Sequence, residues 1–168
     1  MYKRQVLYNN PPSTGNNLLP ESVKQLANGF PNIVGIKESS TNFEQLSKLI
    51  RLTKSDKFSV IVGLEPHILG GLLLGAKGAV AASGNVIPEI LVQLYESFEN
   101  GDIEKATKLQ NKVNKFFDLL HLSAFPGTVK DILRIMGKDY GRARSPVMEV
   151  SEKYVNQIKD VLKELELR

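Results

Sequence analysis

Cysteine is absent from this 168-residue sequence, and histidine occurs only twice. The first absence excludes disulfides, thiolate metal sites and cysteine nucleophiles, and it fits a reducing compartment. His67 and His121 have no histidine or carboxylate partner at ligand spacing, so we expect no metal site. Any catalytic chemistry must therefore use other side chains.

Charge of one sign is not concentrated anywhere in the chain. Residues 1–100 carry 9 basic and 8 acidic side chains, and the remainder carry 13 and 10. We therefore expect neither nucleic acid nor a membrane surface as a partner. The opening "MYKRQVLYNN" lacks the apolar core of a signal peptide, and Lys77 interrupts the apolar stretch that precedes residue 86. These features predict a cytoplasmic protein.

Short apolar runs alternate with helical patterns in the first half of the chain. The runs are bounded by Gly, Asn or Pro, which is typical of parallel strands buried on both faces. Their repeated order predicts right-handed βαβ units. The expected strands are 5–10, 32–38, 58–63 and 78–84, and the expected helices between them are 20–28, 42–53 and 67–76.

The second half of the chain shows only helical spacing of its apolar residues, with helices expected at 88–98, 101–120, 127–136 and 151–167. We therefore expect two parts, 1–98 with four βα units and 99–168 as a C-terminal helical extension. Four βα units could form an open doubly wound sheet, whereas a closed barrel needs eight units and about 250 residues.

A lysine stands at the end of one expected strand, in "NIVGIKESS". A lysine amine is almost never fully buried without a partner. Lys37 therefore either extends from the strand end into solvent or is kept there because its nitrogen reacts. This segment alone leaves both interpretations open.

Three motifs follow one another along the chain, "YNNPPSTG" (8–15), "GIKESS" (35–40) and "VGLEPHILGGLLLGAKGAVAASGNVIPE" (62–89). In this order they resemble the dihydrodipicolinate synthase and N-acetylneuraminate lyase family of (β/α)₈ lysine aldolases, as far as about Pro146. The resemblance implies an α/β fold of the TIM-barrel class, of which this chain is the C-terminal half, strands five to eight. The opening "MYKRQ" does not resemble the family, so we expect either a truncated reading frame that begins within strand five or a scar at the start of the chain.

The resemblance also implies the catalytic residues. Lys37 would form a Schiff base with pyruvate, which requires an uncharged amine, and apolar neighbours on its strand disfavour the charged form. Tyr8 would move protons between substrate and lysine, since a phenol both donates and accepts. Thr14 would place its hydroxyl near the tyrosine, and Gly15 would allow a close backbone approach. No metal and no other cofactor is implied.

Four further residues bear on the substrate. Ser13 stands where the family's synthases usually carry an arginine that pairs with a substrate carboxylate. Glu65 stands where its sugar-acid aldolases carry an acidic residue that accepts hydrogen bonds from substrate hydroxyls, although a solvated loop charge is the alternative. Gly63 would let the backbone approach the ligand, and Val80 would pack against the pyruvate methyl side.

With these residues, the resemblance implies a pyruvate-dependent aldolase of the 2-keto-3-deoxy-sugar-acid type, with an aldehyde as second substrate. The alternatives are 4-hydroxy-tetrahydrodipicolinate synthase and a non-catalytic half-barrel module. We expect a homo-oligomer, tetramer or dimer, when the barrel is complete, and no turnover by this chain alone.

Overall fold

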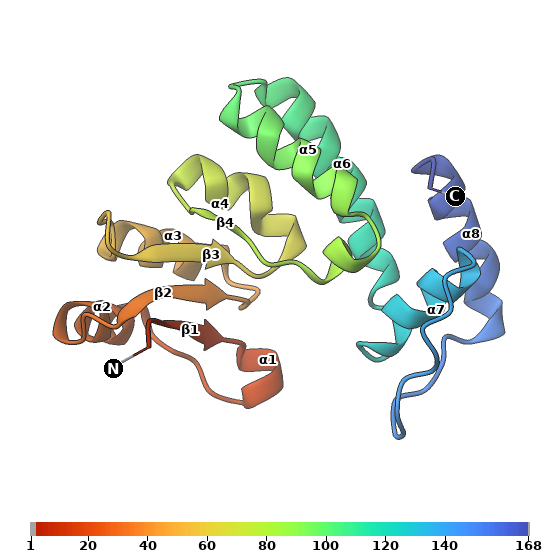
Figure 1. Cartoon of the computed structure of the whole chain (residues 1–168), viewed down its shortest axis with the longest axis horizontal. Coiled ribbons are helices and arrows are strands. Elements are labelled where there is room, and N and C mark those ends of the chain that lie inside the picture. Colours follow the sequence, from red (N-terminus) through yellow and green to blue (C-terminus); the bar gives the residue numbers. More distant parts are fainter. Residues whose placement is uncertain (1–2, 168) are drawn as a thin grey trace. The chain divides into compact units, whose positions relative to one another are not determined.

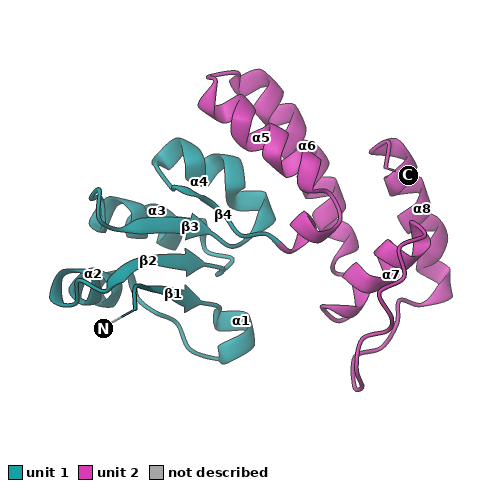
Figure 2. Ribbon diagram, viewed as in Figure 1, with its two compact units in different colours: residues 1–81 teal, residues 82–168 magenta. Residues whose placement is uncertain are grey.

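The computed structural model describes residues 3–167, and the chain forms two compact units, residues 1–81 and 82–168 (Figure 2). The first unit contains the whole sheet and the second is helical. The boundary that we expected after residue 98, between half-barrel and extension, stays a prediction. No helix among the described residues has both the length and the apolar character needed to cross a membrane.

A four-stranded parallel sheet forms the centre of the first unit (Figure 1). Its strands stand in chain order, which confirms the predicted βαβ arrangement and makes β1 and β4 the edge strands. The register pairs Tyr8 of β1 with Lys37 of β2, and Lys37 with Ile61 of β3. The strands are β1 (Gln5–Asn9), β2 (Ile33–Glu38), β3 (Ser59–Val62) and β4 (Gly78–Ala79).

The three long connections of the first unit are helical, as predicted. Pro20 occupies a favoured first-turn position, and the Asn42 side chain accepts a hydrogen bond from the Gln45 amide at the start of the next helix. Each helix packs against the strand that follows it in the chain, and consecutive helices also contact one another. The helices are α2 (Pro20–Gly29), α3 (Phe43–Leu52) and α4 (Ile68–Leu74).

The helices of the first unit cover one face of the sheet. Ile36, Val60 and Val62 are buried against the helices, whereas Val6 and Tyr8 on the other face of β1 are 55% and 54% exposed. The expectation of strands buried on both faces was therefore wrong for this chain.

The fourth strand is shorter than predicted. Residues 78–84 were expected to be extended, but β4 ends at Ala79 and Ala82–Asn85 form a 3₁₀ turn. The Ser83 carbonyl accepts hydrogen bonds from the amides of Val86 and Ile87, at 2.9 and 2.8 Å, so a helical turn replaces the ladder there.

The second unit consists of the four predicted helices, with α5 packed against α6. The apolar stripe of α6 is buried at Ala106, Val113 and Phe116, although Ile103 at its start is 39% exposed. Asp102 caps this helix by accepting a hydrogen bond from the Lys105 amide. The helices are α5 (Pro88–Glu99), α6 (Ile103–Leu119), α7 (Gly127–Ile135) and α8 (Val155–Glu164).

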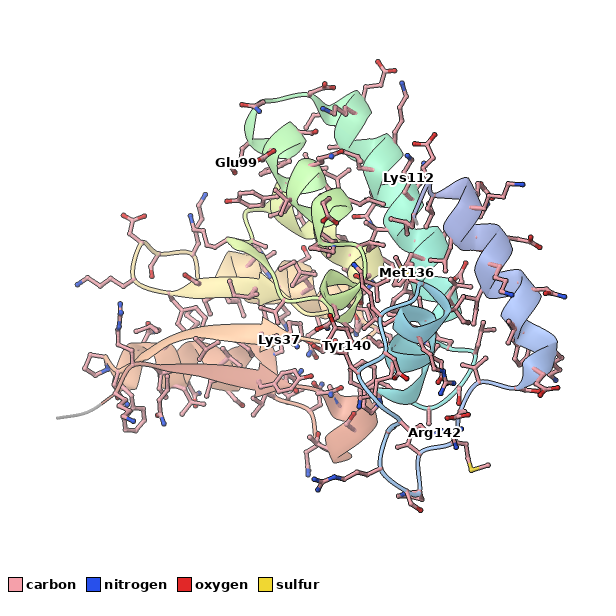
Figure 3. The ribbon with its side chains drawn as sticks, turned by 45° about the vertical axis from the view of Figure 1, so that its right-hand side comes forward. Lys37, Glu99, Lys112, Met136, Tyr140 and Arg142 are labelled. Atoms are coloured by element: carbon pink, nitrogen blue, oxygen red, sulfur yellow. The ribbon has the colours of Figure 1, made fainter. Side chains whose placement is uncertain are left out.

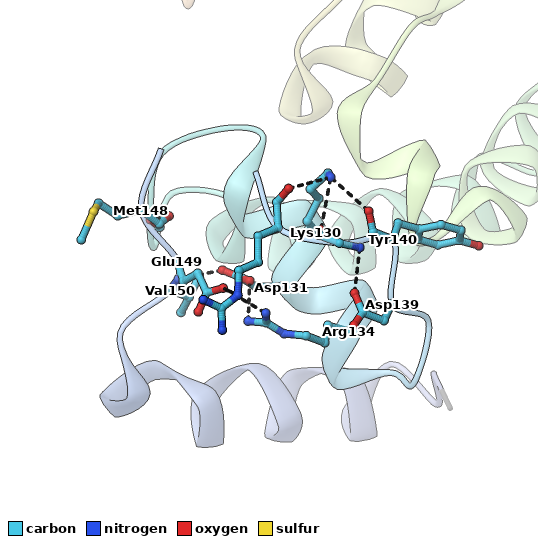
Figure 4. A network of polar contacts seen from close by, with 11 residues as sticks. Lys130, Asp131, Arg134, Asp139, Tyr140, Met148, Glu149 and Val150 are labelled. Atoms are coloured by element: carbon cyan, nitrogen blue, oxygen red, sulfur yellow. Dashed lines mark hydrogen bonds and ion pairs between the residues drawn. The ribbon is translucent and has the colours of Figure 1, made fainter. Parts of the chain in front are cut away.

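Polar contacts attach the segment between α7 and α8 to α7 (Figure 4). The Lys130 ammonium donates to three successive backbone carbonyls, those of residues 140–142, at 3.1 to 3.2 Å. Asp131 accepts from the Val150 amide at 2.7 Å, and Arg134 bridges Asp131 and Glu149. A segment without regular structure is thereby fixed at both of its ends.

Candidate functional site

The predicted reactive lysine lies beside the predicted proton-transfer tyrosine. Lys37 is the fifth residue of β2, and Figure 3 shows it at the carboxyl end of that strand. Its Nζ is 4.5 Å from the centroid of the Tyr8 ring, on the face of the sheet that the helices do not cover. Lys37 is half-buried, so its amine reaches this open face while its stem packs on the strands.

The segment after β1 forms a short helix, α1 (Pro11–Thr14), which the sequence analysis missed. The side-chain nitrogen of Asn10, Nδ2, donates to the Tyr8 hydroxyl at 3.1 Å and to Ser13 Oγ at 3.0 Å. Ser13 is thereby joined to Tyr8 through Asn10. Proline at the first helical positions was the sequence signal for α1.

The helix end places the two other residues predicted in this loop. Thr14 Oγ1 lies 3.0 Å from the backbone oxygens of Asn10 and Asn16, so the backbone of its own loop holds this hydroxyl. Gly15 has φ +70°, and its amide donates to the Pro11 carbonyl at 2.9 Å. Glycine is needed there because L side chains rarely adopt that conformation.

Gly63 lies directly against the lysine. A Cβ built at this position would be 2.9 Å from Lys37 Cε and 2.0 Å from Ser39 Oγ. The absence of a side chain at Gly63 therefore makes room for the lysine stem. This role is separate from the predicted approach of the Gly63 backbone to a ligand. Gly63 donates its amide to the Glu38 carbonyl at 2.7 Å, which fixes this close approach.

Ser39 is a further candidate residue, which the sequence analysis missed. Its hydroxyl is buried and has no hydrogen-bond partner among the described residues. A buried hydroxyl without a partner is costly, so it marks a position where a ligand or water would be bound. The available signal was its spacing of two from Lys37, which continues the alternation of an extended strand.

Glu65 lies just after β3 and Val80 lies just after β4, the two strands that follow the strand of Lys37 in the sheet. Glu65 starts the 3₁₀ turn Glu65–His67 and is 3% exposed, so the alternative of a solvated loop charge was wrong. Val80 is 55% exposed and donates its amide to the Val62 carbonyl at 2.9 Å, one position beyond β4. Both residues lie at the carboxyl ends of the strands, where parallel α/β folds place their ligands.

His67 ends the 3₁₀ turn that Glu65 begins, and its surroundings shift its pKa. Its burial lowers the pKa of the imidazole below 6.5, partly offset by the charge of Glu38. Its ring packs edge-on against Phe43, with centroids 5.2 Å apart. No group of three or more His, Asp or Glu residues within 3–167 is arranged to hold a metal ion.

The comparisons with known proteins agree with this geometry. A 4-hydroxy-tetrahydrodipicolinate synthase of Archaeoglobus fulgidus is 40% identical over 162 residues, which are 96% of this chain and 55% of that protein. The synthase of Methanocaldococcus jannaschii is 35% identical over the same length and the same shares. The chain thus spans about half the length of the curated relatives that it matches.

Solved structures show the same partial coverage. A dihydrodipicolinate synthase of Thermotoga maritima superposes with a TM-score of 0.92 at 33% identity, covering 97% of this chain and 56% of that one. A prophage protein of the dihydrodipicolinic acid synthase family from E. coli K12, solved in complex with pyruvate, superposes at 0.89 with 31% identity and the same coverage. The family model described as the dihydrodipicolinate synthetase family matches residues 3–165. The chain therefore belongs to the dihydrodipicolinate synthetase family.

Proposed function

We propose that Lys37 forms a Schiff base with pyruvate and that the bound pyruvate adds to an aldehyde, in the manner of the 4-hydroxy-tetrahydrodipicolinate synthases. The observation that carries the proposal is the position of the Lys37 amine 4.5 Å from the Tyr8 ring, at the carboxyl end of paired strands. An amine that acts as nucleophile needs a neighbouring group to take and return protons.

The reaction divides into steps that these two residues can perform. The uncharged amine attacks the keto carbon, and the carbonyl oxygen leaves as water when the C=N bond forms. Loss of a methyl proton from the imine gives an enamine, whose carbon then bonds to the aldehyde carbon while the aldehyde oxygen takes up a proton and the C=N bond to Lys37 re-forms. Attack on this bond by water, or by the amino group of the product, releases the product and returns the Lys37 amine. Tyr8 supplies and removes these protons, because its one oxygen both donates and accepts.

The aldehyde in this proposal is aspartate semialdehyde, because the relatives are named synthases. This reverses the order of our sequence-based expectations, which placed the sugar-acid aldolase first because Ser13 replaces an arginine. With Ser13 at that position, the substrate carboxylate needs other donors. The hydroxyls of Ser13 and Ser39 are able to donate to it.

A sugar-acid aldolase is the second candidate, favoured by the burial of Glu65 at 3% exposure. A buried carboxylate can accept hydrogen bonds from the hydroxyls of a polyol. Under this alternative, Ser13→Arg would weaken cleavage of a sugar acid with an uncharged tail by adding a cation without a partner. Equal rates for both forms would contradict the alternative.

The open face of the sheet supports a further part of the proposal. We propose that four more βα units complete the barrel over this face, that the active form is a homo-oligomer, and that it acts in the cytoplasm. Under this proposal the chain alone lacks turnover. The non-catalytic half-barrel module remains the alternative from outside enzyme chemistry.

The test uses this chain together with the first four βα units of the Archaeoglobus fulgidus relative. Pyruvate and borohydride should leave a reduced pyruvyl adduct on Lys37, located by peptide mass spectrometry, and Lys37→Arg should abolish it. Adding either aspartate semialdehyde or glyceraldehyde then distinguishes the two candidates by which one is consumed. Failure to form the adduct in the complemented protein would contradict the aldolase proposal and favour the non-catalytic half-barrel module.

A further inference from the structure

Four polar side chains meet behind the reactive lysine, on the helix-covered face of the sheet. Asn9 and Glu38 are register partners, one position beyond Tyr8 and Lys37, and they are 1% and 2% exposed. The Asn9 amide nitrogen donates to Glu38 Oε2 at 2.9 Å, and that of Gln45 on α3 donates to the same oxygen at 3.1 Å. The other carboxylate oxygen accepts from the Ser40 amide at 2.6 Å.

The fourth member of this cluster, Asn17, comes from the loop that follows β1. Its Oδ1 accepts from Asn9 at 2.9 Å and from Gln45 at 3.0 Å, and its amide nitrogen donates to Gln45 Oε1 at 2.8 Å. Asn17 is an exposed residue, yet its side chain makes three hydrogen bonds into a buried cluster. Its neighbour Asn16 is also exposed, and its side-chain nitrogen only reaches the Thr14 carbonyl at 3.4 Å.

The orientation of each amide in this cluster follows from the donors around it. The Leu18 backbone N–H can only donate, and it donates to Asn9 Oδ1 at 2.9 Å. The Asn9 nitrogen must then face Glu38 and Asn17, so Asn17 must present its oxygen to Asn9 and its nitrogen to Gln45. Each of the three side-chain amides donates through its nitrogen and accepts through its oxygen, so the hydrogen bonds fix the orientation of all three.

We propose that Asn17 is a positioning residue, which fastens the loop of residues 10–16 to the strand ends that carry Tyr8 and Lys37. The loop leaves β1 at Asn9 and is tied back to Asn9 through Asn17 and the Leu18 amide. Its intervening residues carry Ser13 and Thr14, whose bonds are otherwise made within the loop and to Tyr8 through Asn10. Asn17 thereby sets where these hydroxyls stand relative to Lys37.

This inference deepens the proposed function and rests on it for its effect on substrate. Lys37 lies on β2, outside the fastened loop, so loss of Asn17 should leave pyruvate addition to the lysine intact. The second substrate would contact the loop hydroxyls, so its binding should weaken. A general loss of folding would reduce both steps alike.

The test compares the same substitutions at two adjacent asparagines. Asn17→Ala should speed hydrogen exchange of the Ser13, Thr14 and Leu18 amides by about 5- to 10-fold, the effect of losing a typical hydrogen bond. Asn17→Asp has the same volume but turns an oxygen toward Gln45 Oε1, so it should release the loop as alanine does. Asn16→Ala and Asn16→Asp, with the same changes of volume and charge, should leave exchange unchanged.

Kinetics of the complemented protein give the second measurement. Asn17→Ala should raise KM for the aldehyde several-fold while the rate of trapping pyruvate on Lys37 stays within about twofold of wild type. Equal exchange in the Asn16 and Asn17 variants, or equal losses in both kinetic steps, would overturn the positioning role. Exchange needs no turnover, so it tests Asn17 even where a missing pyruvate adduct has already refuted the aldolase proposal.

Discussion

The Lys37 amine stands 4.5 Å from the centre of the Tyr8 ring, and the two residues are direct register partners in β1 and β2. This relationship depends on the ladder that pairs the strands as well as on the side chains. A slip of β1 by one residue would turn Tyr8 toward the helices and Asn9 toward the open face, and it would separate Tyr8 from Lys37. The buried Asn9–Glu38 hydrogen bond, 2.9 Å long, opposes that slip.

Substitutions at this pair should separate the two proposed roles. Lys37→Arg should abolish the borohydride-trapped pyruvate adduct, because a guanidinium stays charged and forms no imine. Tyr8→Phe should still form the adduct but lower kcat by about 10²- to 10⁴-fold, the usual contribution of a positioned proton donor and acceptor. Trapping and turnover are measured on the same complemented protein. Normal turnover of Tyr8→Phe would remove Tyr8 from the mechanism.

Gly63→Ala should displace the lysine. The added Cβ would meet Ser39 Oγ, Lys37 Cε and the Glu38 carbonyl, all within 3.0 Å, and the carbonyl cannot move without disturbing β2. We expect the unfolding free energy to fall by about 1 to 3 kcal/mol, as in other overpacked sites, and adduct formation to slow at least tenfold. Urea denaturation and pyruvate trapping measure the two effects.

The matched control for this change is Gly29→Ala at the end of α2. Nothing lies within 4 Å of a Cβ built there, so we expect unchanged trapping and an unfolding free energy that is equal or slightly higher. If Gly29→Ala and Gly63→Ala behave alike, the close approach at Gly63 has no role in placing Lys37.

Much of the fold was predictable because its signals are local. The apolar runs of β1, β2 and β3 and the helical spacing of α5 to α8 lie within single segments, and the structure confirms them. The short β4 was not predictable from its apolar residues, because what ends it is a turn stabilised by the Ser83 carbonyl. The exposure of one face of β1 was not predictable either, because an apolar run does not reveal which of its side chains the helices cover.

The residues of the candidate site likewise divide into those that the sequence indicated and those that it did not. Lys37, Tyr8, Ser13 and Thr14 lie in ordered motifs and were identifiable by resemblance. Ser39 and Asn17 were missed because their roles depend on burial and on side chains that are distant in sequence. A serine and an asparagine in polar stretches have no pattern that distinguishes them from ordinary turn residues.

Acidification should weaken the first unit through His67. Burial lowers its folded-state pKa below 6.5, so the unfolded chain takes up the proton first as the pH falls. The stability that neutral His67 contributes is complete above its unfolded pKa and is lost as the pH falls through the folded one. Between about pH 7.5 and about pH 5.5, the urea midpoint of wild type should fall more than that of His67→Gln. Parallel curves would show that His67 does not titrate differently on folding.

Acidification should weaken the second unit through Glu149, at a lower pH than it weakens the first unit. The hydrogen bond from Arg134 lowers the folded-state pKa of Glu149 below 4.5. This contribution is present above the unfolded pKa of the carboxyl and is lost as the pH falls through the folded one. Below about pH 4, residues 139–150 should become more sensitive to pepsin in wild type, whereas Glu149→Gln should show that sensitivity already at higher pH. Identical pepsin sensitivity of both proteins at every pH would contradict this role of Glu149.

The open face of the sheet should make this chain depend on a complementing half. Val6 and Tyr8 are more than half exposed on β1, and β1 and β4 present unpaired edges within the described sheet. Exposed edges and apolar side chains favour association, so the chain purified alone should self-associate and show no pyruvate-dependent turnover.

Addition of the first four βα units of the Archaeoglobus fulgidus relative should protect the β1 and β4 amides from hydrogen exchange and restore turnover. The same half carrying prolines in its edge strands is the matched control, because proline removes the donors that pair with β1 and β4. Robust turnover by the isolated chain would refute the half-barrel interpretation.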